Sequence, residues 1–185
     1  MNALSNNLGV WVGDNLVCVK VAGRANFSGS VDLKALVSAM WEKGYHHFVL
    51  DLTECLLMDS TFLGVLAGLG LKFNGNTQAS ATANGSANGN GNHAIELLNP
   101  SVRIADLLEN LGITHLFDIT RGKLTTECLT RLDHAPMQAG RREVQQTCLD
   151  AHRTLMDVNP GNVPKFKDVA QFLAEDIKKM DGKAS

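Results

Sequence analysis

The strand-turn-helix segment at residues 48–64 constrains the fold of this chain most. It reads FVLDLTECLLMDSTFLG. Its apolar start predicts a buried strand, a short loop follows, and a helix is expected to begin at Phe62. Asp59, Ser60 and Thr61 lie directly before that helix. The segment therefore predicts a serine presented at the surface, at the positive end of a helix and beside a carboxylate.

Two interpretations of Asp59-Ser60-Thr61 follow from chemistry alone. All three residue types are favoured as helix caps, and a cap stabilises a helix by about 1 kcal/mol. The alternative is a regulated phosphoserine at Ser60. A phosphoryl group adds roughly −1.5 to −2 charge, which helix-end amides partly accommodate and the neighbouring Asp59 repels. A structural cap and a charge switch both remain open at this point.

Strands and helices are also predicted before this segment. A hairpin is expected over residues 10–21, because two β-rich runs flank Gly13-Asp14-Asn15. Gly23-Arg24-Ala25-Asn26 is predicted to be a loop. Apolar residues spaced i, i+3, i+4 over residues 33–41 predict a helix that Gly44 ends. A helix between two strands predicts a crossover and at least partly parallel pairing.

The helix after Asp59 contains several glycines, among them Gly64, Gly68 and Gly70. Each glycine inside a helix costs about 1 kcal/mol relative to alanine. Close approach of another element is therefore expected, with the helix packed flat on the sheet as the simplest cause.

Residues 74–92 contain no charge and no large apolar side chain, which predicts a flexible surface loop. The pattern after it predicts a strand, a helix, a strand and a helix, in that order, at residues 95–98, 99–112, 116–119 and 124–132. Asn99 is expected to cap the first of these helices, with Pro100 at its first position and Gly112 at its end.

Residues 134–185 form a separate predicted unit after a first domain of residues 1–133. Two amphipathic helices are expected, broken at Asn159-Pro160-Gly161-Asn162. Their apolar positions are Val144, Cys148, Ala151 and Leu155 in the first, and Phe166, Val169, Ala170, Leu173 and Ile177 in the second. The pair either packs on the first domain as a helical hairpin or forms an oligomer contact, such as that of a homodimer.

The predicted architecture is α/β: a small mixed β-sheet covered by helices, with a C-terminal two-helix extension. Hydrophobic residues make up 44% of the 185 residues, enough for a globular core. The formal net charge of −2 gives no attraction toward nucleic acid or anionic membrane. Because the sequence shows neither a secretory leader nor a membrane span, a cytoplasmic protein is expected.

Motifs of enzymes and metal sites are absent from the sequence. It has no GxxxxGK[ST], GxGxxG or HExxH, and no GxSxG surrounds Ser60. His46-His47, at the entrance of a strand, is expected to face solvent or to be bonded locally rather than to bind metal. The four cysteines form no CxxC pair, so no disulfide is expected, and Cys18 and Cys55 are predicted to be small buried apolar residues. We therefore expect no enzyme, no cofactor and no metal.

The segment FVLDLTECLLMDSTFLGVLAGL resembles the signature of STAS domains, the family of bacterial anti-sigma factor antagonists. That signature is an apolar strand ending in Asp-Leu, a short loop, and then Met-Asp-Ser-Ser/Thr-x-Leu-Gly-Val-Leu. Residues 16–23 resemble the family's second strand with its closing glycine. Residues 99–112 resemble its segment from Ser-Pro-x-Val to a glycine after a Leu-rich helix. The resemblance spans roughly residues 8–132.

The resemblance implies a partner switch that regulates transcription. In the family, the unphosphorylated domain binds an anti-sigma factor with serine kinase activity, phosphorylation breaks the complex, and a protein phosphatase restores it. Ser60 falls on the phosphorylated serine, with Thr61 as the secondary acceptor. The residues implied in partner binding are Asp59, Thr61, Phe62, Gly23, Arg24 and Asn26.

The chain departs from the family at several places. Arg24 and Asn26 stand where the family has acidic residues, and Phe62 replaces a common glycine. Residues 74–92 and the C-terminal extension are additions to a minimal member. An alternative is a STAS subunit of a transport or signalling scaffold that is never phosphorylated. A third class, a nucleotide-binding enzyme, lacks a visible phosphate loop.

Overall fold

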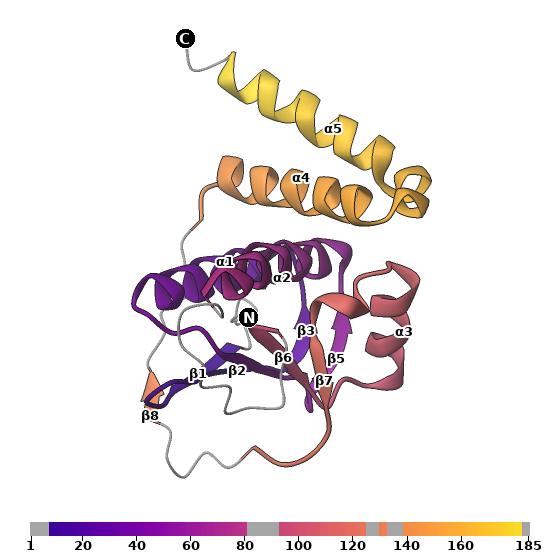
Figure 1. Ribbon diagram of the computed structural model, residues 1–185. Coiled ribbons are helices and arrows are strands. Elements are labelled where there is room, and N and C mark those ends of the chain that lie inside the picture. Colours follow the sequence, from indigo (N-terminus) through magenta and orange to yellow (C-terminus); the bar gives the residue numbers. More distant parts are fainter. Residues whose placement is uncertain (1–7, 81–92, 125–129, 133–138, 183–185) are drawn as a thin grey trace.

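The computed structural model describes residues 8–80, 93–124, 130–132 and 139–182 of the chain (Figure 1). Its strands are β1 (Leu8–Val12), β2 (Val17–Val21), β3 (Gly23–Ala25), β4 (Phe48–Asp51), β5 (Cys55–Met58), β6 (Ile95–Leu98), β7 (Asp118–Thr120) and β8 (Thr130–Leu132). Its helices are α1 (Phe27–Glu42), α2 (Ser60–Ser80), α3 (Val102–Asn110), α4 (Arg141–Val158) and α5 (Val163–Asp181), with 3-10 turns η1 (Thr114–Leu116) and η2 (Pro160–Asn162).

The main sheet is mixed and has the strand order β7-β6-β4-β2-β1-β8. β2, β4, β6 and β7 are parallel neighbours, whereas β1 is antiparallel to both β2 and β8. The hairpin predicted around Gly13-Asp14-Asn15 is therefore confirmed. The crossover through α1 is confirmed as well, because α1 joins the parallel strands β2 and β4.

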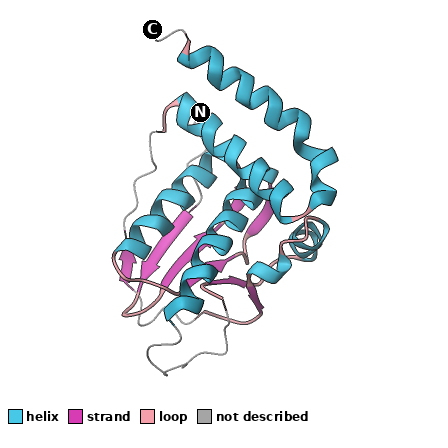
Figure 2. Cartoon of the chain, turned by 45° about the horizontal axis from the view of Figure 1, so that its top comes forward, coloured by secondary structure: helices cyan, strands magenta, loops and turns pink. Residues whose placement is uncertain are grey.

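Helices α1 and α2 lie together on one face of this sheet (Figure 1, Figure 2). The core between them is filled by strand residues such as Phe48 and Leu50 and by helix residues such as Leu33 and Leu66, all fully buried. Phe73 of α2 stacks on Trp41 of α1 with ring centroids 4.0 Å apart. This packing follows from the apolar spacing that predicted the two helices.

A second, two-stranded parallel sheet of β3 and β5 was not predicted. The expected loop at residues 23–26 contains the short strand β3, and the expected turn before Asp59 contains β5. Two strands as short as these give little periodic signal. In addition, β5 follows the strand β4 after only three residues, in the segment that was predicted to be a short loop.

Helix α2 starts and ends at positions that differ from the prediction. It begins at Ser60 rather than Phe62 and continues to Ser80, so the first part of the predicted loop at residues 74–92 is helical. Asn74 anchors this part, since its side chain donates to the Leu116 carbonyl at 3.0 Å and accepts from the Ala94 amide at 3.1 Å. Residues 81–92 lie outside the described residues, so their predicted flexibility stays a prediction.

The start of α3 also corrects a prediction. Ser101, not Asn99, is its cap, because the Ser101 hydroxyl accepts from the Ile104 amide at 3.3 Å. Asn99 instead adopts a positive φ of 54° and exchanges hydrogen bonds with the backbone of Gly122. The side chain of Asn99 therefore stabilises a turn between two segments. Gly112 ends the helix as predicted, with φ at +72°.

The region after α3 differs from its predicted pattern. The last parallel strand is β7, preceded by the 3-10 turn η1, where one strand at residues 116–119 was expected. The helix predicted over residues 124–132 is wrong at its end, because Thr130–Leu132 is strand β8. Pairing with the edge of β1 outweighs a helical spacing of only a few residues. Residues 125–129, which include Cys128, lie outside the described part.

The two predicted C-terminal helices, α4 and α5, form an antiparallel hairpin that we call the C-terminal hairpin. α4 lies across α1 and α2 on the side away from the sheet, and α5 lies on the outer side of α4 (Figure 1, Figure 2). Ala151 and Leu155 of α4 belong to the main core, whereas Leu149 contacts α5. The predicted α/β architecture with a two-helix extension is confirmed, and the hairpin packs on the first domain. None of the helices that the structure describes is long and apolar enough to cross a bilayer.

Candidate functional site

The small sheet of β3 and β5 brings together two groups of predicted site residues that are separate in the sequence. Ala25 of β3 pairs with Met58 of β5, and the amide of Asp59 donates to the Ala25 carbonyl at 3.0 Å. Asn26 and Asp59 are therefore neighbours, each directly before a helix. The N-termini of α1 and α2 consequently point to the same part of the surface, where their dipoles favour negative charge.

Asp59 ties these two helix starts together. One carboxylate oxygen accepts from the Phe62 amide in the first turn of α2 at 2.8 Å, and the other accepts from the Phe27 amide at the start of α1, also at 2.8 Å. Asn26 caps α1 with bonds from the amides of Ser28 and Gly29 at 3.1 and 3.2 Å. The helix cap of α2 is thus Asp59, which leaves the Ser60 hydroxyl without a capping role.

The Ser60 hydroxyl is bonded to His152 of α4. The distance between Ser60 Oγ and His152 Nε2 is 2.9 Å, and His152 Nδ1 lies 2.7 Å from the carbonyl oxygen of Cys148. A carbonyl only accepts, so Nδ1 carries the proton of the neutral ring and Nε2 is the acceptor. The Ser60 hydroxyl therefore donates to His152.

This contact corrects the prediction that Ser60 is presented at the surface. Ser60 is half-buried, and His152 is only 6% exposed. The cause is α4, which lies over the start of α2. Sequence reasoning missed His152 because it is 92 residues from Ser60. One signal was present: His152 follows Cys148 by four residues, which places a polar ring beside the apolar stripe of α4.

The remaining predicted site residues differ in accessibility. Arg24 is exposed and Gly23, at φ +67°, is half-buried. Thr61 is only 6% exposed, and its hydroxyl bonds the Cys148 thiol. Phe62 is fully buried in the main core. The large side chain at position 62 thus fills the interior, and it is not available to a partner at the surface.

Helix α4 approaches α2 most closely at Gly64. A Cβ placed on Gly64 would clash with the Ala151 carbonyl oxygen, well inside van der Waals contact. A Cβ on Gly68, one turn later, would meet only the Thr154 side chain at an ordinary 3.9 Å. The glycines were expected to let α2 lie flat on the sheet. At Gly64 the close neighbour is α4, and at Gly70 it is Leu116 and Phe117.

Cys148 of α4 lies at this contact, beside Thr61 of α2. Burial raises the pKa of its thiol, and Asp59 acts in the same direction, whereas the hydrogen bond with Thr61 lowers it. Cys148 is half-buried, while Cys18 and Cys55 are buried in the domain as predicted, and all three are free thiols. A thiol between α2 and α4 thus differs in reactivity from two thiols inside the core.

The arrangement holds a hydroxyl near the positive ends of two helix dipoles, with α4 lying over it. A serine bonded to a histidine is also the first part of a nucleophile–base pair. A hydrolase, however, needs open space at the hydroxyl, which α4 covers here. Within the described residues, no cluster of three histidine, cysteine or acidic side chains could hold a metal ion.

Comparison with solved structures finds proteins of similar layout. A Thermotoga maritima crystal structure assigned as an anti-sigma factor antagonist has a TM-score of 0.48 and 17% identity, covering 65% of this chain and 89% of that one. The anti-sigma factor antagonist SpoIIAA in its unphosphorylated form gives 0.42 and 16%, covering 65% and 91%. The Bacillus cell fate determinant SpoIIAA in its phosphorylated form gives 0.43 and 14%, covering 68% and 90%.

No family model and no curated protein matches the chain. The three solved structures named above share 14–17% sequence identity with this chain. The assignment of the fold therefore depends on the strand order and helix packing of this chain itself.

Proposed function

We propose that this chain is a STAS-type anti-sigma factor antagonist, a non-enzymatic protein-binding switch of the cytoplasm with Ser60 as its phosphate acceptor. The observation that carries the proposal is the division of roles at the start of α2. Asp59 caps α2 and also accepts from the first amide of α1, which Asn26 caps, and the adjacent Ser60 hydroxyl is left to make a contact that can change. A serine needed as a cap could not be modified without loss of the helix start.

Charge is the physical means of the proposed switch. A phosphoryl group adds roughly −1.5 to −2 charge beside the Asp59 carboxylate and at the N-terminus of α2. The helix amides offset part of this charge, so the fold tolerates it. A partner that binds the same surface with acidic groups is repelled, since like charges across an interface cost several kcal/mol.

The surface around Ser60 has features of a protein contact. Arg24 is exposed on β3, and two large apolar side chains remain exposed on neighbouring elements, Phe27 at 49% and Leu56 at 69%. Aromatic residues and arginine are enriched in protein interfaces. We propose this surface, with Gly23, Asn26 and Asp59, as the binding site for an anti-sigma factor with serine kinase activity. A protein phosphatase would reverse the modification.

The test is to map phosphorylation on the full chain. We would incubate it with ATP and the anti-sigma serine kinases of its own organism, and locate the modified residue by mass spectrometry, with Ser60→Ala as the control. Modification at Ser60 is expected, and Thr61 is a poorer acceptor because it is buried. Modification elsewhere only, or none by any such kinase, would sink the proposal.

Binding measurements test separately whether negative charge at position 60 lowers the affinity for the partner. Ser60→Ala should keep partner affinity and lose regulation, whereas Ser60→Asp should bind the partner more weakly. Titration of both variants by calorimetry decides this. Equal affinities would mean that partner binding does not depend on the charge at position 60.

One observation favours a second candidate function. The Ser60 hydroxyl is already satisfied by His152 beneath α4, as it would be in a STAS-type interaction subunit of a transport or signalling scaffold that is never phosphorylated. In that case the surface at Arg24 and Phe27 binds a partner with α4 in place. Kinase assays without any modification, together with partner binding unaffected by Ser60→Ala, would select this alternative.

A further inference from the structure

We propose that the C-terminal hairpin is a displaceable cap on Ser60, and that α4 must leave the start of α2 before Ser60 can be phosphorylated or can meet a partner. This inference rests on the proposed function and adds a regulation built into the chain itself. It begins from the 2.9 Å between Ser60 Oγ and His152 Nε2. A phosphoryl group on Oγ needs the space that the imidazole occupies.

His152 holds the cap at its centre. Its ring accepts from Ser60, donates to the Cys148 carbonyl, and packs against Phe166 of α5 with centroids 5.2 Å apart. One side chain thus joins the domain, α4 and α5. When Ser60 Oγ carries a phosphoryl group, the hydroxyl hydrogen that His152 accepts no longer exists. Modification therefore removes a bond of the closed state as well as filling its space.

The polar and close contacts of the cap are specific to the closed position. Thr61 bonds the Cys148 thiol, and the Ala151 backbone rests directly on Gly64. Only glycine at position 64 allows that approach. Ser60 at the start of α2, Thr61 beside it and Gly64 one turn later all contact α4, so the closed cap covers part of the Ser60 surface of α2.

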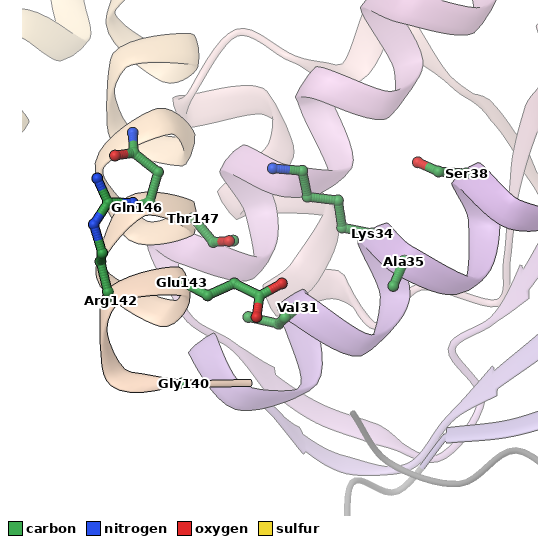
Figure 3. A pocket seen from close by; sticks show the side chains of 9 residues that line it. All are labelled: Val31, Lys34, Ala35, Ser38, Gly140, Arg142, Glu143, Gln146 and Thr147. Atoms are coloured by element: carbon green, nitrogen blue, oxygen red, sulfur yellow. The ribbon is translucent and has the colours of Figure 1, made fainter. Parts of the chain in front are cut away.

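The flank of α4 toward α1 is much less tightly packed. A cavity of about 550 Å³ lies between the two helices, lined by Val31, Lys34 and Ser38 on α1 and by Glu143 and Thr147 on α4, among others (Figure 3). A smaller cavity of about 180 Å³ continues along α2 beside Lys72. This space is open to solvent, so α4 is attached less closely to α1 than to α2, where the Ala151 backbone meets Gly64.

The other end of the cap is firmly attached. The side chain of Asn162 is fully buried and donates to the carbonyls of Leu111 and Leu155, both at 2.9 Å. Lys165 donates to the Asn110 carbonyl at 3.1 Å. The turn between α4 and α5 thus stays on the end of α3 while the rest of α4, through His152, lifts away from Ser60. Closure of α4 over Ser60 then disfavours phosphorylation of Ser60, and phosphorylation disfavours closure to the same extent, because the two equilibria are linked.

The chain offers a matched pair of variants for the test. Gly64→Ala places a methyl group against the α4 backbone and should open the cap, while it improves the helix propensity of α2. Gly68→Ala makes the same chemical change one turn later, where there is room, and should leave the cap closed. Both changes are made in the full chain.

The native cysteines report cap opening without any kinase. The rate of alkylation by iodoacetamide is measured for each cysteine by peptide mass spectrometry. Gly64→Ala should raise the Cys148 rate by about tenfold or more over the wild type and Gly68→Ala. Cys18 and Cys55 should stay slow, because they are buried in the domain. If they also become fast, Gly64→Ala has unfolded the domain, and His152→Ala serves as the second opening variant.

The kinase assay is then run on the same three proteins. Faster phosphorylation of Ser60 in Gly64→Ala than in the wild type and Gly68→Ala, and faster Cys148 alkylation after phosphorylation, support the cap. Unchanged Cys148 rates in Gly64→Ala and His152→Ala overturn it. So do equal phosphorylation rates despite an exposed Cys148. No phosphorylation in any variant, with Cys148 exposed by Gly64→Ala, contradicts the proposed function but upholds the cap.

Discussion

At the scale of single residues, the sequence allowed either Asp59 or Ser60 to cap α2, and in the structure Asp59 is the cap while Ser60 bonds α4. A carboxylate has enough acceptor sites to serve two helix ends, and both of its oxygens are used. A hydroxyl has one hydrogen to donate, and that of Ser60 goes to His152. The structural role and the proposed regulatory role are thereby placed on different side chains. The consequence is that the two residues respond differently to substitution.

Asp59→Ala should lower the free energy of unfolding by about 2 kcal/mol, because the first turns of α1 and α2 each lose a charged acceptor. Asp59→Asn should lower it less, since one amide oxygen can still accept from Phe62. Urea denaturation of the two variants and the wild type checks this order. Equal stability of all three would mean that Asp59 does not join the helices.

Cys18 gives a prediction for alkaline pH. Burial raises the pKa of its thiol to about 12 from an ordinary value of 9.0, with Asp51 adding to the shift and Lys20 opposing it. Between these values the folded chain keeps a proton that the unfolded chain has lost, so stability should fall as pH rises from 9 toward 12. In Cys18→Ala this decline should be shallower, although Cys55 and Cys148 add to it in the same direction. Denaturation at several pH values compares the slopes, and parallel slopes would contradict the assignment.

At the scale of the elements, the sequence predicts what is periodic and local. The β1–β2 hairpin, α1, β4, β6 and both C-terminal helices follow from apolar spacing and from turn residues such as Gly13 and Gly44. The small sheet of β3 and β5 was not predicted, because β3 has only three residues within a Gly- and Asn-containing stretch and β5 lies in the short segment between β4 and α2 that was predicted to be a loop. Nor could the contact between Ser60 and His152, which depends on how two helices far apart in sequence pack.

Asn162 should be the most sensitive polar residue of the C-terminal hairpin. Asn162→Ala leaves the buried carbonyls of Leu111 and Leu155 without their shared donor, which should lower the free energy of unfolding by about 2–3 kcal/mol. Asn159→Ala is the control, since its bond to Leu111 is longer at 3.4 Å. Thermal melts of both variants compare them. A smaller loss in Asn162→Ala than in Asn159→Ala would mean that the turn is not what attaches the hairpin to α3.

At the scale of the whole molecule, the chain is built in layers: the sheet, then α1 and α2, then α4, then α5 (Figure 1). α4 has two apolar faces, one given to the main core through Ala151 and Leu155, and one given to α5 through Leu149. The outer side of α5 still exposes Val169 at 38% and Phe172 at 63%. Because α4 lies between α2 and α5, its removal exposes apolar side chains that it covers. Truncation of the chain therefore tests what α4 covers.

A chain that ends at Asp133 should melt at a lower temperature than the full chain and should bind a hydrophobic dye, because α2 loses the cover of α4. A chain that ends at Val158 is the control. It keeps α4 over Ser60 and loses only α5, so its dye binding should come from the outer face of α4 at Leu149. Light scattering on the same samples tests the predicted homodimer through the C-terminal helices. A mass that halves on truncation, with no change in the melt of the dilute domain, would show that these helices join two chains rather than cover one. An unchanged mass with an unchanged melt would contradict both roles, because neither the domain nor a second copy would then depend on the hairpin.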